Sequence, residues 1–142
     1  DELTALHLAV VSRAERRNEI CRLLLESPRF TAINAMDDYG FNALHSACAV
    51  GNVDAFRILS EDSRVDVNAS VEESPNTALH IAVSKGFEDM CCALLECRRF
   101  SAADAKDHKG KTAFDWAAFK HMGNLCALLI KDSLLDVDLV LK

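Results

Sequence analysis

The sequence lacks a long apolar run and a surplus of basic residues. No stretch approaches the roughly 18 to 20 apolar residues needed to cross a bilayer, so we expect no membrane insertion. The chain does not open with the charged, apolar and small-residue pattern of a signal peptide. Its 16 Lys and Arg against 22 Asp and Glu give a net charge of −6. A broad phosphate-binding surface needs an excess of positive charge, so we expect no nucleic-acid partner.

Motifs that carry chemistry are missing as well. The sequence contains no phosphate-binding glycine loop, no G-x-S-x-G elbow and no H-E-x-x-H motif. Cys91, Cys92, Cys97 and His108 could be drawn as a zinc site, but Cys91 occupies a packing position and the spacing of the others matches no known finger. We therefore predict a protein that is not an enzyme, with no catalytic residues, no cofactor and no metal site.

Six cysteines would suit a disulfide framework, but a chain in which half of the residues are apolar does not need one. Cys21, Cys91 and Cys126 share one repeated position with Phe56, and successive members are 35 residues apart. A position that accepts cysteine or phenylalanine is a packing position, because unpaired cysteine behaves as a small hydrophobic residue. We expect reduced thiols in a cytoplasmic or otherwise intracellular protein.

One short phrase occurs four times, as TALHLA at Thr4, NALHSA at Asn42, TALHIA at Thr77 and TAFDWA at Thr112. A second apolar segment follows each phrase, for example NEICRLLLE from Asn18. Its apolar residues recur at i, i+3 and i+4, which predicts one buried stripe that includes Ile20, Leu23 and Leu24. Self-similarity at this period predicts stacked units of two helices, each too small to bury its own apolar face.

These units resemble ankyrin repeats. The resemblance rests on the T-x-L-H-x-A phrase and its variants, on the turn glycines Gly51 and Gly86, and on DYGF and HKGK before the second and fourth phrases, and it covers essentially the whole chain. It implies an all-α ankyrin-repeat solenoid of about four stacked helix-turn-helix units joined by hairpin-like loops. We expect one domain over residues 1–142, with units at approximately 1–36, 37–71, 72–106 and 107–142.

The repeat register continues to the end of the chain, because DSLLDVD at Asp132 matches DSRVDVN at Asp62. We therefore expect that the chain is a fragment of a longer protein and that the array continues beyond it. Pro75 occupies the place of Gly40 and Gly110 before the third phrase. Because proline cannot adopt the positive φ that glycine allows, we expect an irregular hairpin with an acidic tip there.

Three histidines recur at one point of the first helix: His7, His45 and His80. Stacked helices lie about 10 Å apart, so these side chains cannot share one zinc ion. The resemblance implies that they bond to neighbouring backbone and tie the units together, with Asp115 in the fourth place. It also makes Asn34 and Asn68 potential hydroxylation targets, although a turn-forming role suits asparagine better.

The resemblance implies a non-catalytic module, monomeric as a fragment, that binds a protein or peptide partner through its hairpin tips and the concave face of its first helices. The alternative is an intramolecular regulatory or scaffolding domain that controls an enzyme or channel domain elsewhere in the full-length chain. The candidate binding residues are Asp38, Tyr39, Phe41, Val50, Glu73, Asn76, Lys85, His108, Lys109, Lys111, Phe119 and Lys120.

Four of these candidates are apolar or aromatic and have no evident place in the buried stripe, namely Tyr39, Phe41, Val50 and Phe119. They form an exposed apolar patch of the kind that marks a binding site, or they pack on a neighbouring hairpin or a further repeat. The sequence leaves these alternatives open. Trp116, by contrast, is expected to pack in the core.

Overall fold

The computed structural model describes residues 4–140 of the chain, with side chains described as far as Lys131. The helices of this range are α1 (Ala5–Val11), α2 (Arg17–Glu26), α3 (Ala43–Val50), α4 (Val53–Glu61), α5 (Ala78–Lys85), α6 (Glu88–Glu96), α7 (Ala113–Phe119) and α8 (Gly123–Val140). Within it, the only β structure is an isolated bridge between Ser70 and Thr77. The predicted all-α class is confirmed.

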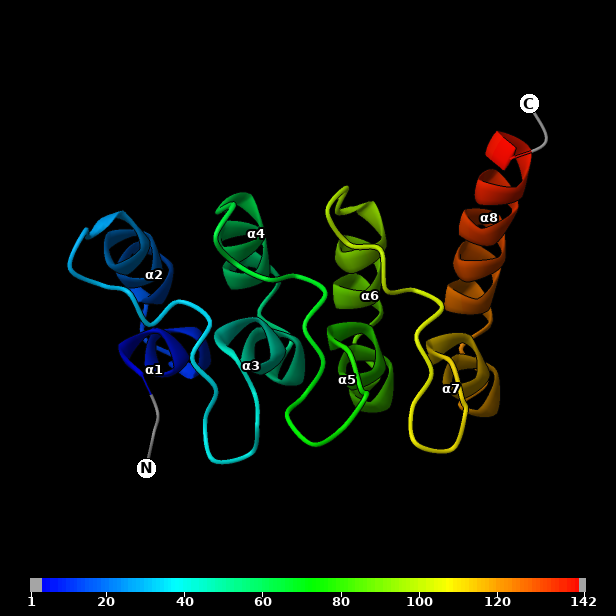
Figure 1. Ribbon diagram of the computed structural model, residues 1–142, viewed down its shortest axis with the longest axis horizontal. Coiled ribbons are helices and arrows are strands. Elements are labelled where there is room, and N and C mark those ends of the chain that lie inside the picture. Colours follow the sequence, from blue (N-terminus) through cyan, green and yellow to red (C-terminus); the bar gives the residue numbers. More distant parts are fainter. Residues whose placement is uncertain (1–3, 141–142) are drawn as a thin grey trace.

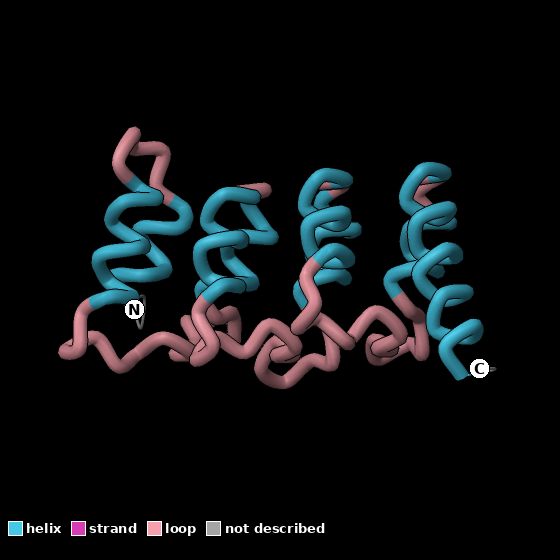
Figure 2. The backbone as a smooth tube through the Cα atoms, turned by 90° about the horizontal axis from the view of Figure 1, so that it is seen from above, coloured by secondary structure: helices cyan, strands magenta, loops and turns pink. Residues whose placement is uncertain are grey.

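The helices form four pairs that stack side by side. Each first helix contacts its own second helix and the first helix of the next pair, and the second helices contact one another in the same order. The first helices α1, α3, α5 and α7 therefore form one row, and α2, α4, α6 and α8 form the other (Figure 1). Figure 2 shows the longer loops gathered along one edge of the stack, with the short turns within each pair at the opposite edge.

The repeated phrase begins each first helix by capping it. In α3, the Asn42 side chain accepts from the His45 N–H at 2.9 Å, and His45 Nδ1 accepts from the Asn42 N–H at 3.2 Å. This reciprocal capping box satisfies two backbone donors that the first turn leaves unpaired. The same box is formed from the other three caps, with Asp115 in place of histidine in α7.

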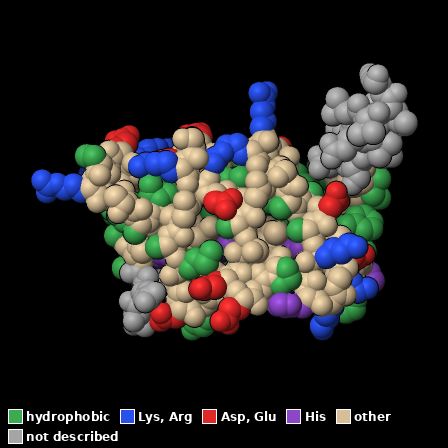
Figure 3. All heavy atoms as spheres, viewed as in Figure 1, with side chains coloured by type: hydrophobic (Ala, Val, Ile, Leu, Met, Phe, Trp, Pro, Cys, Tyr) green, Lys and Arg blue, Asp and Glu red, His purple; other side chains and the backbone are tan. Residues whose placement is uncertain are grey.

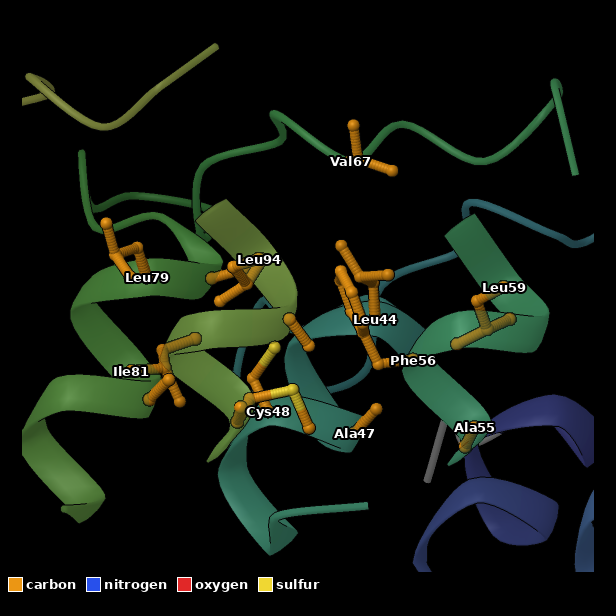
Figure 4. Close-up of a cluster of buried hydrophobic side chains, with 14 of the residues drawn as sticks. Leu44, Ala47, Cys48, Ala55, Phe56, Leu59, Val67, Leu79, Ile81 and Leu94 are labelled. Atoms are coloured by element: carbon orange, nitrogen blue, oxygen red, sulfur yellow. The ribbon is translucent and has the colours of Figure 1, made fainter. Parts of the chain in front are cut away.

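The core lies between the two rows of helices. Leu44 from α3 lies beside Phe56 from α4 in this layer, as Figure 4 shows, and Cys48 and Leu59 belong to the same buried cluster. The position shared by cysteine and phenylalanine is a packing position, because Cys21, Phe56 and Cys91 are fully buried, whereas Cys126 is half-buried. All six cysteines are free thiols. Burial raises the pKa of Cys48 strongly and that of Cys91 to about 12, which keeps both neutral.

The predicted burial of Ile20 and Leu23 is wrong. These side chains are 43% and 59% exposed, while Leu24 is half-buried. At the positions that match Ile20, the residues Ala55, Met90 and Leu125 are buried, because α4, α6 and α8 each pack on the second helix of the preceding pair. In the described part of the chain, α2 has no preceding pair.

The last helix also departs from the repeat. The register of DSLLDVD predicts a connecting loop from Asp132, but α8 continues through it to Val140. In the corresponding loops, Arg64 and Arg99 donate to carbonyl groups at the end of the preceding second helix or beyond it, and residue 134 is a leucine. No helix among the described residues is both long enough and apolar enough to span a membrane.

Candidate protein-binding surface

The histidines of the repeated phrase fix the loops that precede the next first helix. Because Nδ1 of each ring accepts from the backbone N–H of its cap, Nε2 carries the proton and donates. His7 donates to the Phe41 carbonyl at 2.8 Å, His45 to the Ala69 carbonyl at 2.9 Å, and His80 to the Lys111 carbonyl at 3.1 Å. The predicted ties between units are confirmed.

Two of the three hairpins share one turn. In the first hairpin, residues 37–41, Asp37 Oδ1 accepts from the N–H groups of Tyr39 and Phe41 at 2.9 and 3.0 Å. Asp107 plays the same part in the third hairpin, residues 107–111. The bond from the Lys111 N–H is the largest cause that holds the pKa of Asp107 below its usual range. These carboxylates stabilise the turns, so the tips present the residues between them.

The second hairpin, residues 71–76, is irregular, as Pro75 predicts. Its closing bond runs from the Val71 N–H to the Asn76 carbonyl, which spans one residue more than in the other two hairpins. Glu73 adopts the positive φ of 62° in place of a glycine. Glu72 donates its N–H to the Gly40 carbonyl at 3.0 Å, so the first and second hairpins are joined by backbone.

A pocket of about 290 Å³ opens where the second hairpin meets the first helices. Ile81 of α5 and Trp116 of α7 supply apolar surface, and Ser74, Asn76 and Ser84 supply polar groups. Phe41, Val71 and His80 complete the lining. Ligand pockets are typically apolar with a few convergent polar groups, which is the chemistry of this lining.

A family model described as Ankyrin repeats (3 copies) matches residues 1–71 and, a second time, residues 65–140. The chain belongs to the ankyrin-repeat family. Ankyrin repeats are generally protein–protein interaction modules and are generally non-catalytic. No curated protein matches this chain.

The ankyrin fold separates the four apolar candidates rather than joining them in one patch. Tyr39 on the first hairpin is 81% exposed, Phe119 at the end of α7 is 79% exposed, and Val50 at the end of α3 is 46% exposed. Since α5 lies between α3 and α7, Val50 and Phe119 are two units apart. Phe41 is half-buried and packs on the core, with its ring centroid 5.8 Å from that of His45. Phe41 therefore takes the packed alternative, and it also lines the pocket.

Trp116 has both a core role and a surface role. It is half-buried against the core, as its sequence position predicts, and its indole N–H donates to the Asp107 carboxylate at 2.9 Å. It also lines the pocket with Ser74 and Ser84, and with Val71 and Ile81, which were not among the sequence candidates. Pro75 was the available signal, because the irregular hairpin it predicts forms one wall.

A second pocket, of about 370 Å³, lies beside α7 and is lined by Lys109, Lys111, Asp115, Trp116, Ala118 and Phe119. Ala118 is exposed, although Val10, Cys48 and Val83 at the matching positions are fully buried against the next ankyrin unit. This pocket therefore lies on a face that stacking covers in the other units. The pocket beside α7 is therefore distinct from the pocket between the second hairpin, α5 and α7.

The exposed charges change sign along the row of hairpins. Asp38, Glu72 and Glu73 lie on the first and second hairpins, whereas His108, Lys109 and Lys111 lie on the third. Figure 3 shows acidic side chains along the lower left and centre of the molecule and basic side chains and histidine at the lower right. Lys85 and Lys120 lie at the other end of the first helices, where Lys120 Nζ donates to the Ser84 carbonyl at 2.6 Å.

The two asparagines of the connecting loops bridge neighbouring ankyrin units. Asn34 donates to the Arg64 carbonyl at 2.7 Å and accepts from the Asp66 N–H at 3.0 Å. Asn68 makes the same pair of bonds to Arg99 and Ser101. Their role is therefore a tie between units rather than a local turn. Within the described residues, no group of three His, Cys, Asp or Glu side chains could hold a metal ion.

Proposed function

We propose that this chain is a non-catalytic module that binds a protein or peptide partner through its hairpin tips and the adjoining face of its first helices. The observation that carries the proposal is the pocket between the second hairpin, α5 and α7. In that hairpin the Val71 and Ser74 N–H groups already donate to the Asn76 and Val71 carbonyls, so a partner can bury apolar surface there without leaving these groups unpaired.

The pocket suits an anchor residue of a partner. Apolar or aromatic side chains that fill a central pocket commonly account for about 2 kcal/mol or more each at protein interfaces. The surrounding tips carry exposed polar and charged groups, which is the arrangement of an interface rim around an apolar centre. A separate protein and a distant segment of the same full-length polypeptide would both meet this surface.

A pocket-filling variant tests the proposal. Ser84 is exposed at the pocket, so Ser84→Arg places a long charged side chain there without entering the core. Ser101→Arg is the matched control, because Ser101 is exposed on a connecting loop outside the pocket. We expect the unmodified chain and Ser101→Arg to capture the same proteins from cell lysate, and Ser84→Arg to reduce their recovery by about tenfold or more, measured by quantitative mass spectrometry. Equal recovery with Ser84→Arg, at unchanged thermal stability, would contradict the proposal.

A further inference from the structure

We propose that the occupant of this surface is an extended segment of a partner protein in which a large apolar side chain separates a basic stretch from an acidic stretch. The apolar side chain enters the pocket, the basic stretch lies over the first and second hairpins, and the acidic stretch lies over the third. This inference rests on the proposed function and adds the chemistry of the partner.

The acidic side of the surface is one continuous unit. The first and second hairpins contain no lysine or arginine, and their exposed acids are Asp38, Glu72 and Glu73. The backbone bond from Glu72 to Gly40 holds the two tips together. A Cβ atom at Gly40 would lie only 2.6 Å from the Glu72 Cβ, so the two hairpins are in close contact. The three carboxylates are therefore carried by two hairpins that are held in a fixed position relative to one another.

The basic side is formed by the third hairpin. Lys109 and Lys111 are exposed, while the one acid of this turn, Asp107, accepts from their backbone N–H groups and from the Trp116 indole. Asp107 thereby holds the hairpin against α7. The two lysine side chains consequently dominate the exposed charge of this tip.

The change of sign coincides with the pocket. Its lining includes Ser74 and Asn76 from the acidic second hairpin on one side and Trp116, which is bonded to the basic third hairpin, on the other. A segment whose apolar side chain fills the pocket must therefore pass from an acidic to a basic environment. Charge complementarity selects a segment with the opposite order of charges.

The weakness of single exposed ion pairs explains why the partner needs a basic stretch and an acidic stretch, each with several charges. A single exposed ion pair contributes little, and salt screens it. Several charges of one sign on each side of an apolar anchor act together on encounter and on the choice of partner. The charge blocks therefore provide selectivity, while burial of the anchor provides most of the binding free energy.

The experiment uses three fluorescein-labelled synthetic peptides with the same central phenylalanine and Gly-Ser spacers. One carries lysines on one side and glutamates on the other, one carries only lysines, and one carries only glutamates. Fluorescence anisotropy at low salt gives their dissociation constants for the chain. We expect the mixed peptide to bind at least about tenfold more tightly than either of the others. Similar affinities for all three, or no binding of the mixed peptide, would overturn the inference.

Charge-reversed variants test whether the preferred peptide follows the charge of each hairpin. Glu72→Lys with Glu73→Lys makes the second and third hairpins basic and leaves Asp38 as the one exposed acid of the first, and we expect this double variant to prefer the all-glutamate peptide. Lys109→Glu with Lys111→Glu makes the row acidic and is expected to prefer the all-lysine peptide. The control, Glu61→Lys with Glu96→Lys, makes the same change in net charge at the ends of α4 and α6 and should keep the preference for the mixed peptide.

Glu61 and Glu96 are exposed, as are Glu72 and Glu73. The two glutamate double variants therefore differ in where the charge changes and not in how much the net charge changes. If Ser84→Arg abolishes binding of all three peptides while their affinities for the unmodified chain are equal, the pocket function stands and the charge inference fails. If the charge variants change preference as expected but Ser84→Arg has no effect, the charges recruit the segment without the pocket, and the inference of an apolar anchor fails.

Discussion

At the scale of single residues, each histidine of the repeated phrase performs two tasks at once. His45 closes the capping box of its own helix and donates to the carbonyl of a loop 24 residues later in the chain. The neutral ring is required for this, because Nδ1 must accept while Nε2 donates. The spacing of the histidines predicts the row of ties, but the acceptor of His45 could not be read from it. His45 meets Ala69, which precedes the irregular second hairpin, and not Asn76, the counterpart of Phe41 and Lys111.

The burial of His45 makes the free energy of unfolding depend on pH. Burial is the largest cause that lowers its pKa, and it outweighs the bond to Ala69 and the carboxylates of Asp66 and Asp37, which raise it. As the pH falls below about 6.5, the unfolded chain takes up a proton at this residue before the folded chain does, so stability falls until the folded pKa is passed. We expect a lower urea midpoint at pH 5.5 than at pH 7.5.

Glutamine is the informative replacement, because it can complete a capping box at this position and does not titrate. His45→Gln should therefore weaken the loss of stability between pH 7.5 and 5.5, measured by urea unfolding. His108→Gln, on an exposed hairpin tip, should retain the loss shown by the unmodified chain. If the two variants show the same pH dependence, His45 is not the source of the effect.

At the scale of the elements, hairpins with the same turn differ in what surrounds them. Gly40 and Gly110 occupy the same place in the first and third hairpins, with φ of 74° and 72°. A Cβ atom would meet the Glu72 backbone N at 2.8 Å in the first case and nothing within 4 Å in the second. The sequence predicts both turns, whereas the contact of the first hairpin with the second depends on the path taken after Val71.

These glycines form a matched pair of variants. Gly110→Ala should cost only the strain of a left-handed alanine, about 1–2 kcal/mol of unfolding free energy. Gly40→Ala should cost more, because the second hairpin must also move away from the new methyl group. Urea unfolding of the two variants measures the difference. Equal losses would show that the hairpins separate without cost.

At the scale of the whole molecule, the stack has interior units and ends, and the same residue type behaves differently in each. Each helix pair buries its apolar face only against its neighbours, so stability is distributed over the interfaces between units. Leu23 and Ile58 occupy one repeat position, but Leu23 is 59% exposed and Ile58 is 8% exposed. Repeat periodicity identifies the position, and only the stacking decides whether it is covered.

We expect this difference to appear directly in stability. Ile58→Ala should reduce the free energy of unfolding by about 2 kcal/mol or more, because it removes buried methyl groups and leaves a cavity. Leu23→Ala should cost less than about 1 kcal/mol in the same urea experiment, since most of its side chain already contacts solvent. A loss at Leu23 as large as that at Ile58 would mean that another part of the chain covers α2.

The sequence by itself determined the helix pairs, their caps, the packing position shared by cysteine and phenylalanine, and the place of each histidine in its capping box. These features depend on periodicity and on bonds within one turn of helix, which residues close in sequence specify. The tertiary structure decided the exposure of Ile20 and Leu23, the half-buried place of Phe41, the helical end of α8 and the pocket beside Trp116. Each of these depends on which units lie against one another, because burial and pocket shape arise from contacts between residues distant in sequence.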